Sequence, residues 1–216
     1  MQRTTPTDWR LPPGRLRPVT RWGDPLMHRP LTPVTGFDES LSQLVADMFA
    51  TMDAADGVGL AANQVGVDLA VFVFDLRPDA SEQVELAVDG DPIPEADLRG
   101  LVGVVCNPVL TTPDVPEQGS EKDSEGCLSL PGAFVPCRRA TVAEVTGRDH
   151  AGQAVHYGGT GLVARCLQHE ADHLRGVVFA DLLPGRHRRK LHAQAARLAA
   201  EYPDDWPVSP RVPSID

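Results

Sequence analysis

The stretch TGLVARCLQHEADHLRG, residues 160–176, carries the signals that decide the architecture. Its first residue is a suitable helix cap and its last a suitable helix stop, so a helix is predicted between them. His169 and His173 are four residues apart and would project from one helix face. Two imidazoles placed in this way can chelate a metal ion, and Glu170 would lie beside a water held by that metal. A solvated helix face is the alternative.

Hydrophobic periodicity predicts further elements around this helix. An amphipathic core helix is expected from about Asp38 to Ala55, because its apolar residues follow the helical period. The segments LAVFVFD and LVGVVCNPVL are apolar on both faces, which is typical of buried strands. The remaining elements are a hairpin with its turn at 149–152 and a last helix. The two strands are expected at 69–75 and 101–110. The hairpin is expected at 139–159 and the last helix from about Gly185 to Glu201.

Composition and charge restrict the class of protein. The chain has 216 residues, of which 42% are hydrophobic, so it is long enough for one globular domain with a real core. A net charge of −10 argues against a surface built to bind DNA. No apolar run approaches the roughly 20 residues that cross a bilayer, and the N-terminus lacks the apolar region of a secretory signal. Reduced thiols and a cytoplasmic location are therefore expected for Cys106, Cys127, Cys137 and Cys166.

A metal held by two histidines needs a further protein ligand. Downstream of the histidines, Asp181, His187 and His192 have no context that favours them. Upstream, Cys127 lies in EGCLS, residues 125–129, after a glycine and a charged loop. As a thiolate it would complete a Cys-His-His site with one open position. A lone cysteine is more often a small buried hydrophobe, so the pattern alone leaves both interpretations open.

A third stretch, GVGLAANQVG, spans residues 57–66. Its two glycines flank Val58 and leave the backbone bare enough for another chain to approach. Such a strand could pair with an extended peptide, and the amide of Gln64 can donate to a carbonyl oxygen. Taken alone, the stretch is equally consistent with an ordinary glycine-rich turn after a helix.

The three stretches, in this order, resemble the motifs of the peptide deformylases. GVGLAANQ matches a Gly-apolar-Gly-apolar-Ala-Ala-x-Gln pattern, EGCLS is identical to the second motif, and QHEADHL matches Gln-His-Glu-x-Asp-His-Leu. The resemblance extends from about Arg21 to Leu183 and implies an α+β fold. Mixed or antiparallel sheets would surround a central metal-binding helix, with an N-terminal core helix and a C-terminal helix.

Composition, together with the extent of the resemblance, predicts a division of the chain. Residues 1–20 would be an extended arm and residues 21–184 the catalytic domain. Residues 77–100 carry seven acidic residues against two basic ones and are expected to be a surface insertion or a hairpin. Residues 185–216 would hold the C-terminal helix and a loose tail.

By resemblance, Cys127, His169 and His173 are the metal ligands. Family members typically work with Fe²⁺, although Zn²⁺, Ni²⁺ or Co²⁺ can occupy the site, and thiolate and imidazole ligands suit several of these metals. Glu170 would take a proton from the water at the metal and hand it to the departing amine.

The implied substrate is a peptide that begins with N-formylmethionine. Gln64, through its side chain, and Leu128, through its backbone N–H, would donate to the oxyanion formed during hydrolysis. By helical spacing alone, Leu162 and Arg165 share a face with His169, whereas Cys166 is expected in the core. The resemblance places five residues around the substrate: Val58, Gly59, Leu162, Arg165 and Cys166.

Two features extend beyond these motifs. The stretch LPGAFVPCRR lacks the aromatic-arginine pair of many members, so their contacts to later substrate residues are not carried over.

In some bacterial members a C-terminal helix docks the enzyme on the ribosome. A basic run makes ribosome binding a hypothesis here, against the simpler interpretation of a solvated face. The run comprises Arg186, Arg188, Arg189 and Lys190.

Two rival functions remain at this level. One is an HExxH zinc endopeptidase, which predicts a third ligand downstream of His173 and tolerance of changes at Cys127. The other is a deformylase-like protein that binds formylated N-termini without turnover. Asp172 could support the ligands or simply pair with Arg175 on its own helix.

Overall fold

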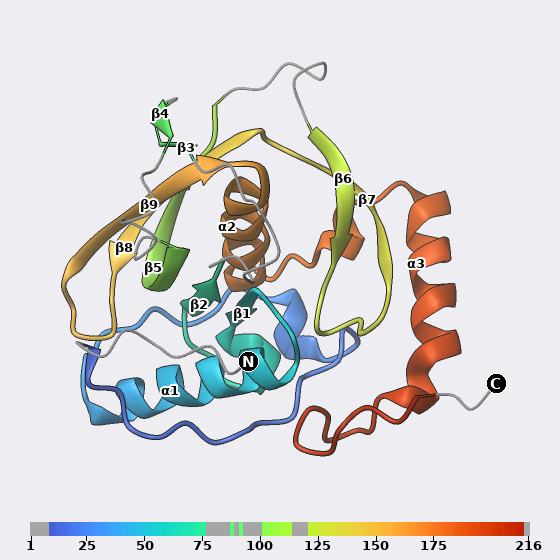
Figure 1. The fold of residues 1–216 in the computed structure, drawn as a ribbon, viewed down its shortest axis with the longest axis horizontal. Helices are drawn as coiled ribbons and strands as arrows, with labels where there is room; N and C mark the ends of the chain where they lie inside the picture. Colours follow the sequence, from blue (N-terminus) through green and yellow to red (C-terminus); the bar gives the residue numbers. More distant parts are fainter. Residues whose placement is uncertain (1–8, 77–86, 89–90, 93–100, 114–120, 214–216) are drawn as a thin grey trace.

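An antiparallel sheet and a strand pair enclose one central helix (Figure 1). The computed structural model describes residues 9–76, 87–88, 91–92, 101–113 and 121–213. The larger sheet has the order β1-β2-β5-β8-β9, and each neighbouring pair is antiparallel. These strands are Gly59–Ala61, Val71–Asp75, Val102–Thr111, Val142–Arg148 and Ala154–Thr160.

The second sheet pairs β6, Glu121–Gly126, with β7, Phe134–Arg139. Most of the expected insertion at 77–100 lies outside the described residues. Within it the structure places only the short paired strands β3, Ala87–Val88, and β4, Asp91–Pro92. The hairpin predicted over 139–159 is confirmed, because β8 and β9 pair along their whole length.

Three α-helices match the predicted ones. They are α1, Glu39–Ala54, α2, Gly161–Leu174, and α3, Gly185–Leu198. Short 3-10 helices occupy Pro25–His28 (η2), Ala62–Val65 (η3), Phe179–Leu182 (η5) and Ala199–Glu201 (η6). The side chain of Asp38 caps α1 by accepting from two backbone N–H groups, as expected. Thr160 precedes α2 in an extended conformation but makes no side-chain cap bond. The α+β fold with a central helix is thus confirmed.

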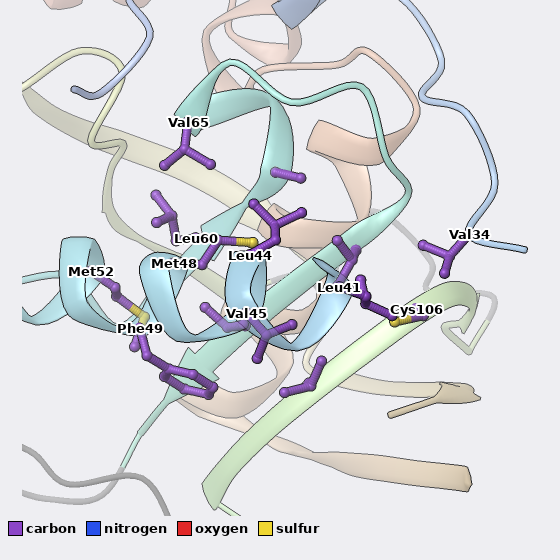
Figure 2. Packing of buried hydrophobic residues seen from close by; sticks show 14 of the residues in the cluster. Val34, Leu41, Leu44, Val45, Met48, Phe49, Met52, Leu60, Val65 and Cys106 are labelled. Carbon is purple, nitrogen blue, oxygen red and sulfur yellow. The ribbon is translucent and has the colours of Figure 1, made fainter. Parts of the chain in front are cut away.

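The apolar stripe of α1 packs against β1, β2 and β5 and forms one core (Figure 2). The apolar side chains point toward those of the strands, as the period predicted, and a second side of the helix, with Asp47 and Thr51, is also buried. Residues of α2 form a second core with the other side of the same sheet. The first core contains Leu41, Leu44, Val45, Met48, Phe49, Met52, Leu60, Val73 and Val104.

Both ends of the described chain are fastened to this framework. Along α1, the backbone N–H of Arg15 donates to Asp47 and that of Arg17 to Thr51, at 2.9 and 3.0 Å. The C-terminal tail, expected to be loose, is instead held. Val19 N donates to the carbonyl oxygen of Trp206 at 2.8 Å, across almost the whole sequence. No helix among the described residues is long and apolar enough to cross a membrane.

Candidate metal centre and cleft

The two histidines of α2 meet as their spacing predicted. Their Nε2 atoms lie 3.2 Å apart and both side chains are buried. Burial and the neighbouring His169 lower the pKa of His173 well below its ordinary value. A neutral imidazole is the form that a metal ligand needs, and this shift favours that form at His173, whereas Cys127 and Glu125 raise the pKa of His169 against the effect of its burial.

Cys127 follows β6 directly and brings the third donor. Its Sγ lies 3.3 Å from His173 Nε2. Among the described residues, Cys127, His169 and His173 form the one group of ligating side chains whose donor atoms converge, all within 4.8 Å of one another. One thiolate and two imidazoles fit a divalent metal that keeps an open coordination position.

Glu125, at the end of β6, holds His169 from behind. Its Oε1 lies 2.7 Å from His169 Nδ1, which leaves Nε2 directed at the other donors. Arg139 binds both oxygens of Glu125, at 2.7 and 3.0 Å, and Arg165 adds a contact of 2.8 Å. Burial opposes the charge, but the bonds from His169 and Arg139 outweigh it and hold the pKa of Glu125 well below its usual range.

Arg139 also links this network to α2. Its third nitrogen, Nη1, binds Asp172, which also pairs with Arg175 at the end of α2. Both roles considered for Asp172 are therefore present, since it anchors Arg139 and pairs locally. The guanidinium of Arg139 is buried and lies between two carboxylates on different elements.

Glu170 lies on the other side of His169 and has a different environment. It is buried, and its Oε2 has no hydrogen-bond partner among the described residues. Burial chiefly, helped by the charge of Glu125, raises the pKa of Glu170 to about 7. A Cβ at Gly59 would lie 2.4 Å from Glu170 Oε1, so only glycine leaves room for this carboxylate.

Gln64 is fixed with its amide toward the donors. Its Oε1 accepts from Ala61 N at 2.9 Å, and its Nε2 lies 3.4 Å from Cys127 Sγ and 3.4 Å from Ser129 Oγ. The neighbouring Asn63 donates to the carbonyl oxygen of His173 at 3.0 Å, which ties η3 to α2. The loop after β1 and the metal-binding helix are thus locked together.

A cleft of about 590 Å³ opens onto these groups. All five residues expected around the substrate line it, although the guanidinium of Arg165 is occupied by Glu125 and by the carbonyl oxygen of Cys137. Cys166 belongs both to the core and to the cleft wall. Leu128 and Gln64 also line the cleft, whereas His173 is wholly buried behind it.

Several residues of the site could not be found from the motifs. Arg139 lies outside all three motifs and binds Glu125. Phe134 lines the cleft and lies in the stretch LPGAFVPCRR, which lacks the aromatic-arginine pair of many members. Five further residues of the cleft wall follow α3, and all but Tyr202 come from the tail that was expected to be loose. They are Tyr202, Trp206, Pro207, Pro210 and Arg211.

The downstream candidates for a third ligand lie elsewhere. Asp181 accepts from Val178 N and faces His28, and the ring of His192 packs on Trp22 at 4.5 Å between centroids. His187 lies in the first turn of α3. The endopeptidase interpretation required a ligand from this region, and the donor group contains none.

Three convergent ligands beside a buried glutamate, at the base of an open cleft, define a metal-dependent hydrolase. The family model described as "Polypeptide deformylase" matches residues 16–189. The chain belongs to the peptide deformylase family, whose members depend on a metal.

Individual relatives and solved structures agree. The chain is 44% identical to peptide deformylase 1 of Streptomyces avermitilis over 88% of this chain and 80% of that protein. It is 47% identical to peptide deformylase 2 of Streptomyces coelicolor, over 85% of this chain and 92% of that protein. Its structure resembles that of a deformylase from Legionella pneumophila, with a TM-score of 0.69, 35% identity and coverage of 88% and 100%. The structure of a peptide deformylase from Synechococcus elongatus in complex with actinonin gives a TM-score of 0.66 at 30% identity. The match covers 91% of this chain and 91% of that chain.

Proposed function

We propose that this peptide deformylase removes the formyl group from the N-terminal formylmethionine of newly made proteins and releases formate, at the centre formed by Cys127, His169 and His173. The observation that carries the proposal is the convergence of these three donors, within 4.8 Å, beside a buried glutamate. A divalent metal held there would supply an acidified water as nucleophile and positive charge for the developing oxyanion. Fe²⁺ is our first choice, with Zn²⁺, Ni²⁺ and Co²⁺ as alternatives that the donor set also suits.

Glu170 is the proton carrier in this proposal. A pKa near 7 allows a carboxylate to take a proton from the attacking water and to return it to the departing amine nitrogen. Glu170 lines the cleft, and its Oε2 has no hydrogen-bond partner among the described residues that would compete with the water or the amine. The C–N bond of the formamide breaks, and formate and a free N-terminus are the products.

Gln64 and Leu128 would stabilise the oxyanion. The Gln64 amide is held by Ala61 and directed at the donor cluster, so it needs no rearrangement when charge develops. Leu128 follows Cys127, which fixes its backbone N–H at the same place. Both residues line the cleft.

The substrate backbone would lie against β1. This strand is at the edge of its sheet, because it pairs with β2 alone, so its outer side is available to an extended peptide. Val58 and Gly59 border the cleft there. Leu162, Arg165 and Cys166, on α2, would enclose the methionine side chain through their apolar parts.

The test is anaerobic purification, metal analysis and an assay of formate release from a formyl-Met tripeptide. Cys127→Ala is expected to lose the metal, and Glu170→Ala to keep it with little turnover. Circular dichroism of both variants checks that they remain folded. A metal-loaded parent that releases no formate would overturn the proposal in favour of a binder without turnover.

Ribosome binding through α3 and a cytoplasmic location are parts of the same proposal. Arg186, Arg188, Arg189 and Lys190 are all exposed, while Leu191 of the same helix is buried in the core. A basic face on an acidic protein is suited to RNA phosphates. Changing the four residues to alanine should abolish co-sedimentation with ribosomes, and Arg197→Ala, on the same helix, should preserve it. Unchanged binding by the fourfold variant would remove the idea.

A further inference from the structure

The two histidine ligands on α2 are held in different ways. His169 has its Nδ1 atom 2.7 Å from a carboxylate oxygen of Glu125, which fixes the ring. His173 is the more completely buried of the two, and its Nδ1 has no hydrogen-bond partner among the described residues. When Nε2 of a neutral imidazole binds a metal, the ring proton is on Nδ1. A buried N–H group at His173 is therefore left to be satisfied.

Asn63 is the side chain that bonds to the backbone of this ligand. It lies in η3 and is wholly buried, and its Nδ2 donates to the carbonyl oxygen of His173 at 3.0 Å. Because a carbonyl oxygen can only accept, this contact decides which end of the amide faces α2. The other end, Oδ1, is buried and also has no partner in the part of the chain that the structure describes. Asn63 thus brings an unused acceptor to the residue that carries the unused donor.

The position of Asn63 is set by the backbone around it. Its own carbonyl oxygen accepts from Gly66 N at 3.1 Å, where η3 ends. The carbonyl oxygen of the next residue, Gln64, accepts from Thr20 N at 2.8 Å. A side chain presented by such a framework keeps its place before a metal binds, which is what support of a ligand requires.

The two unused groups are complementary. Nδ1–H of His173 is a donor and Oδ1 of Asn63 is an acceptor, and they do not hydrogen-bond to each other directly. One water between them would satisfy both, because a buried water bonds to about two to four polar groups that are otherwise unpaired. Histidines that bind metals commonly donate their second ring N–H to a carboxylate, a carbonyl oxygen or a water.

We propose that Asn63 is a positioning residue for the metal ligand His173: its amide nitrogen holds the end of α2, and its amide oxygen accepts the Nδ1 proton through one buried water. The ring is then turned with Nε2 toward Cys127 and His169. The proposal rests on the metal centre of the proposed function. Asn63 occupies the undefined position of the Gly-apolar-Gly-apolar-Ala-Ala-x-Gln pattern, so the motif assigns it no role.

The affinity for Zn²⁺, measured by competition with a chelator, tests the proposal. Asn63→Leu is close in size but has neither donor nor acceptor, so the affinity should fall by about 10- to 100-fold. Asn63→Asp keeps an acceptor at the same place and should stay within about threefold of the parent or bind more tightly. Burial favours the protonated form of the new carboxyl group, which can also donate to the carbonyl oxygen of His173.

Asn107→Leu is the matched control. Asn107, on β5, bonds the N–H and the carbonyl oxygen of Val34 at 2.8 Å each, and it lies outside the donor group and the cleft lining. Its loss should lower the midpoint of urea unfolding, as Asn63→Leu does, and leave the Zn²⁺ affinity within about twofold of the parent. A fall of affinity in the control equal to that in Asn63→Leu would show that affinity only follows stability, and the proposal would fail.

The remaining outcomes are equally decisive. Parental affinity in Asn63→Leu, or equal losses in the Leu and Asp variants, would overturn the proposal. If Asn63→Leu does not fold, nuclear magnetic resonance of the Zn²⁺-loaded parent with isotope-labelled histidine decides: an Nδ1–H of His173 that exchanges slowly with solvent supports the water bridge, and rapid exchange contradicts it. A parent that binds no Zn²⁺ would remove the metal centre as well. A parent that binds Zn²⁺ but releases no formate would overturn the proposed function alone.

Discussion

Two buried carboxylates flank His169, and their surroundings differ in almost every respect. Glu125 accepts hydrogen bonds from Arg139, Arg165 and His169, and its pKa is held well below the usual range. Glu170 has one oxygen without a partner among the described residues, and its pKa is raised to about 7. The same functional group is thus fixed as a permanent charge in one place and prepared for proton exchange in the other.

This difference assigns the two carboxylates different tasks: Glu125 holds His169 in place, and Glu170 exchanges a proton. A carboxylate surrounded by guanidinium groups keeps its charge and orients the imidazole that it touches. A desolvated carboxylate at the base of a cleft can change its protonation state near neutral pH. Variants on each side should therefore fail in different ways, and measurements of turnover, stability and metal affinity can distinguish them.

The largest effect on turnover is expected from Glu170→Gln. The amide keeps the shape of the side chain but cannot carry the proton, so kcat should fall by about 10²- to 10⁴-fold while the metal is retained. Formate release and metal content measured on the same sample check this. Glu144→Gln is the control, because Glu144 is an exposed glutamate on β8, and it should stay within about twofold of the parent. Loss of metal from Glu170→Gln would contradict the division of roles.

The largest effect on stability is expected from Arg139→Met. It would leave Glu125 and Asp172 without their shared buried cation, which should lower the free energy of unfolding by about 3–5 kcal/mol. Arg175→Met is the matched control, since Arg175 binds the same Asp172 but its side chain is 61% exposed, and it should cost under about 1 kcal/mol. Urea unfolding of both variants measures the difference. Equal losses would show that burial of the pair is unimportant.

Arg139 also shows where prediction from the sequence ended. The periodic segments gave α1, α2, β2, β5 and the β8–β9 hairpin, and the three motifs gave the donor cluster, because these patterns are local. Arg139 carries no local pattern. Its partners Glu125 and Asp172 come from a neighbouring strand and from a helix 33 residues later, so only the packed fold brings them together.

The C-terminal tail was mispredicted for a related reason. Its prolines and charges are typical of a loose tail, because composition reports the local tendency of the backbone. Its position instead depends on Arg21 and Val19, which lie more than 180 residues away in sequence. Long-range hydrogen bonds of this kind leave no periodic trace, and the cleft wall they create was invisible to pattern analysis.

A smaller effect, on metal affinity, is expected from Glu125→Gln. The amide oxygen can still accept from His169, but the charge that raises the basicity of the imidazole is lost, so metal affinity should fall by about 10- to 100-fold. Competition with a chelator measures this, with Glu170→Gln as the comparison variant that should bind as the parent does. Equal affinities in the two variants would mean that Glu125 does not tune the site.

The smallest effect is a change of pH, which acts on the two carboxylates unequally. Glu170 must be ionised to accept a proton, so kcat should fall as pH drops through its pKa, about 7 without a metal, by up to about tenfold for each pH unit below that pKa. The positive charge of a bound metal lowers that pKa, which moves the fall below pH 7 and never above it.

Glu125 should not respond in the same interval. Its pKa is depressed in the folded state, so its contribution to stability is complete above about 4.3, the ordinary value for a glutamate, and is lost only as pH falls through the depressed value. Of these two carboxylates only Glu170 is expected to titrate between about pH 8 and pH 5.5, so kcat should decline there without a matching loss of metal that would come from Glu125. If activity declines only as metal is lost, the group that responds to pH belongs to the Glu125 side of His169. If kcat does not change with pH, the pKa of Glu170 is far lower than its burial implies.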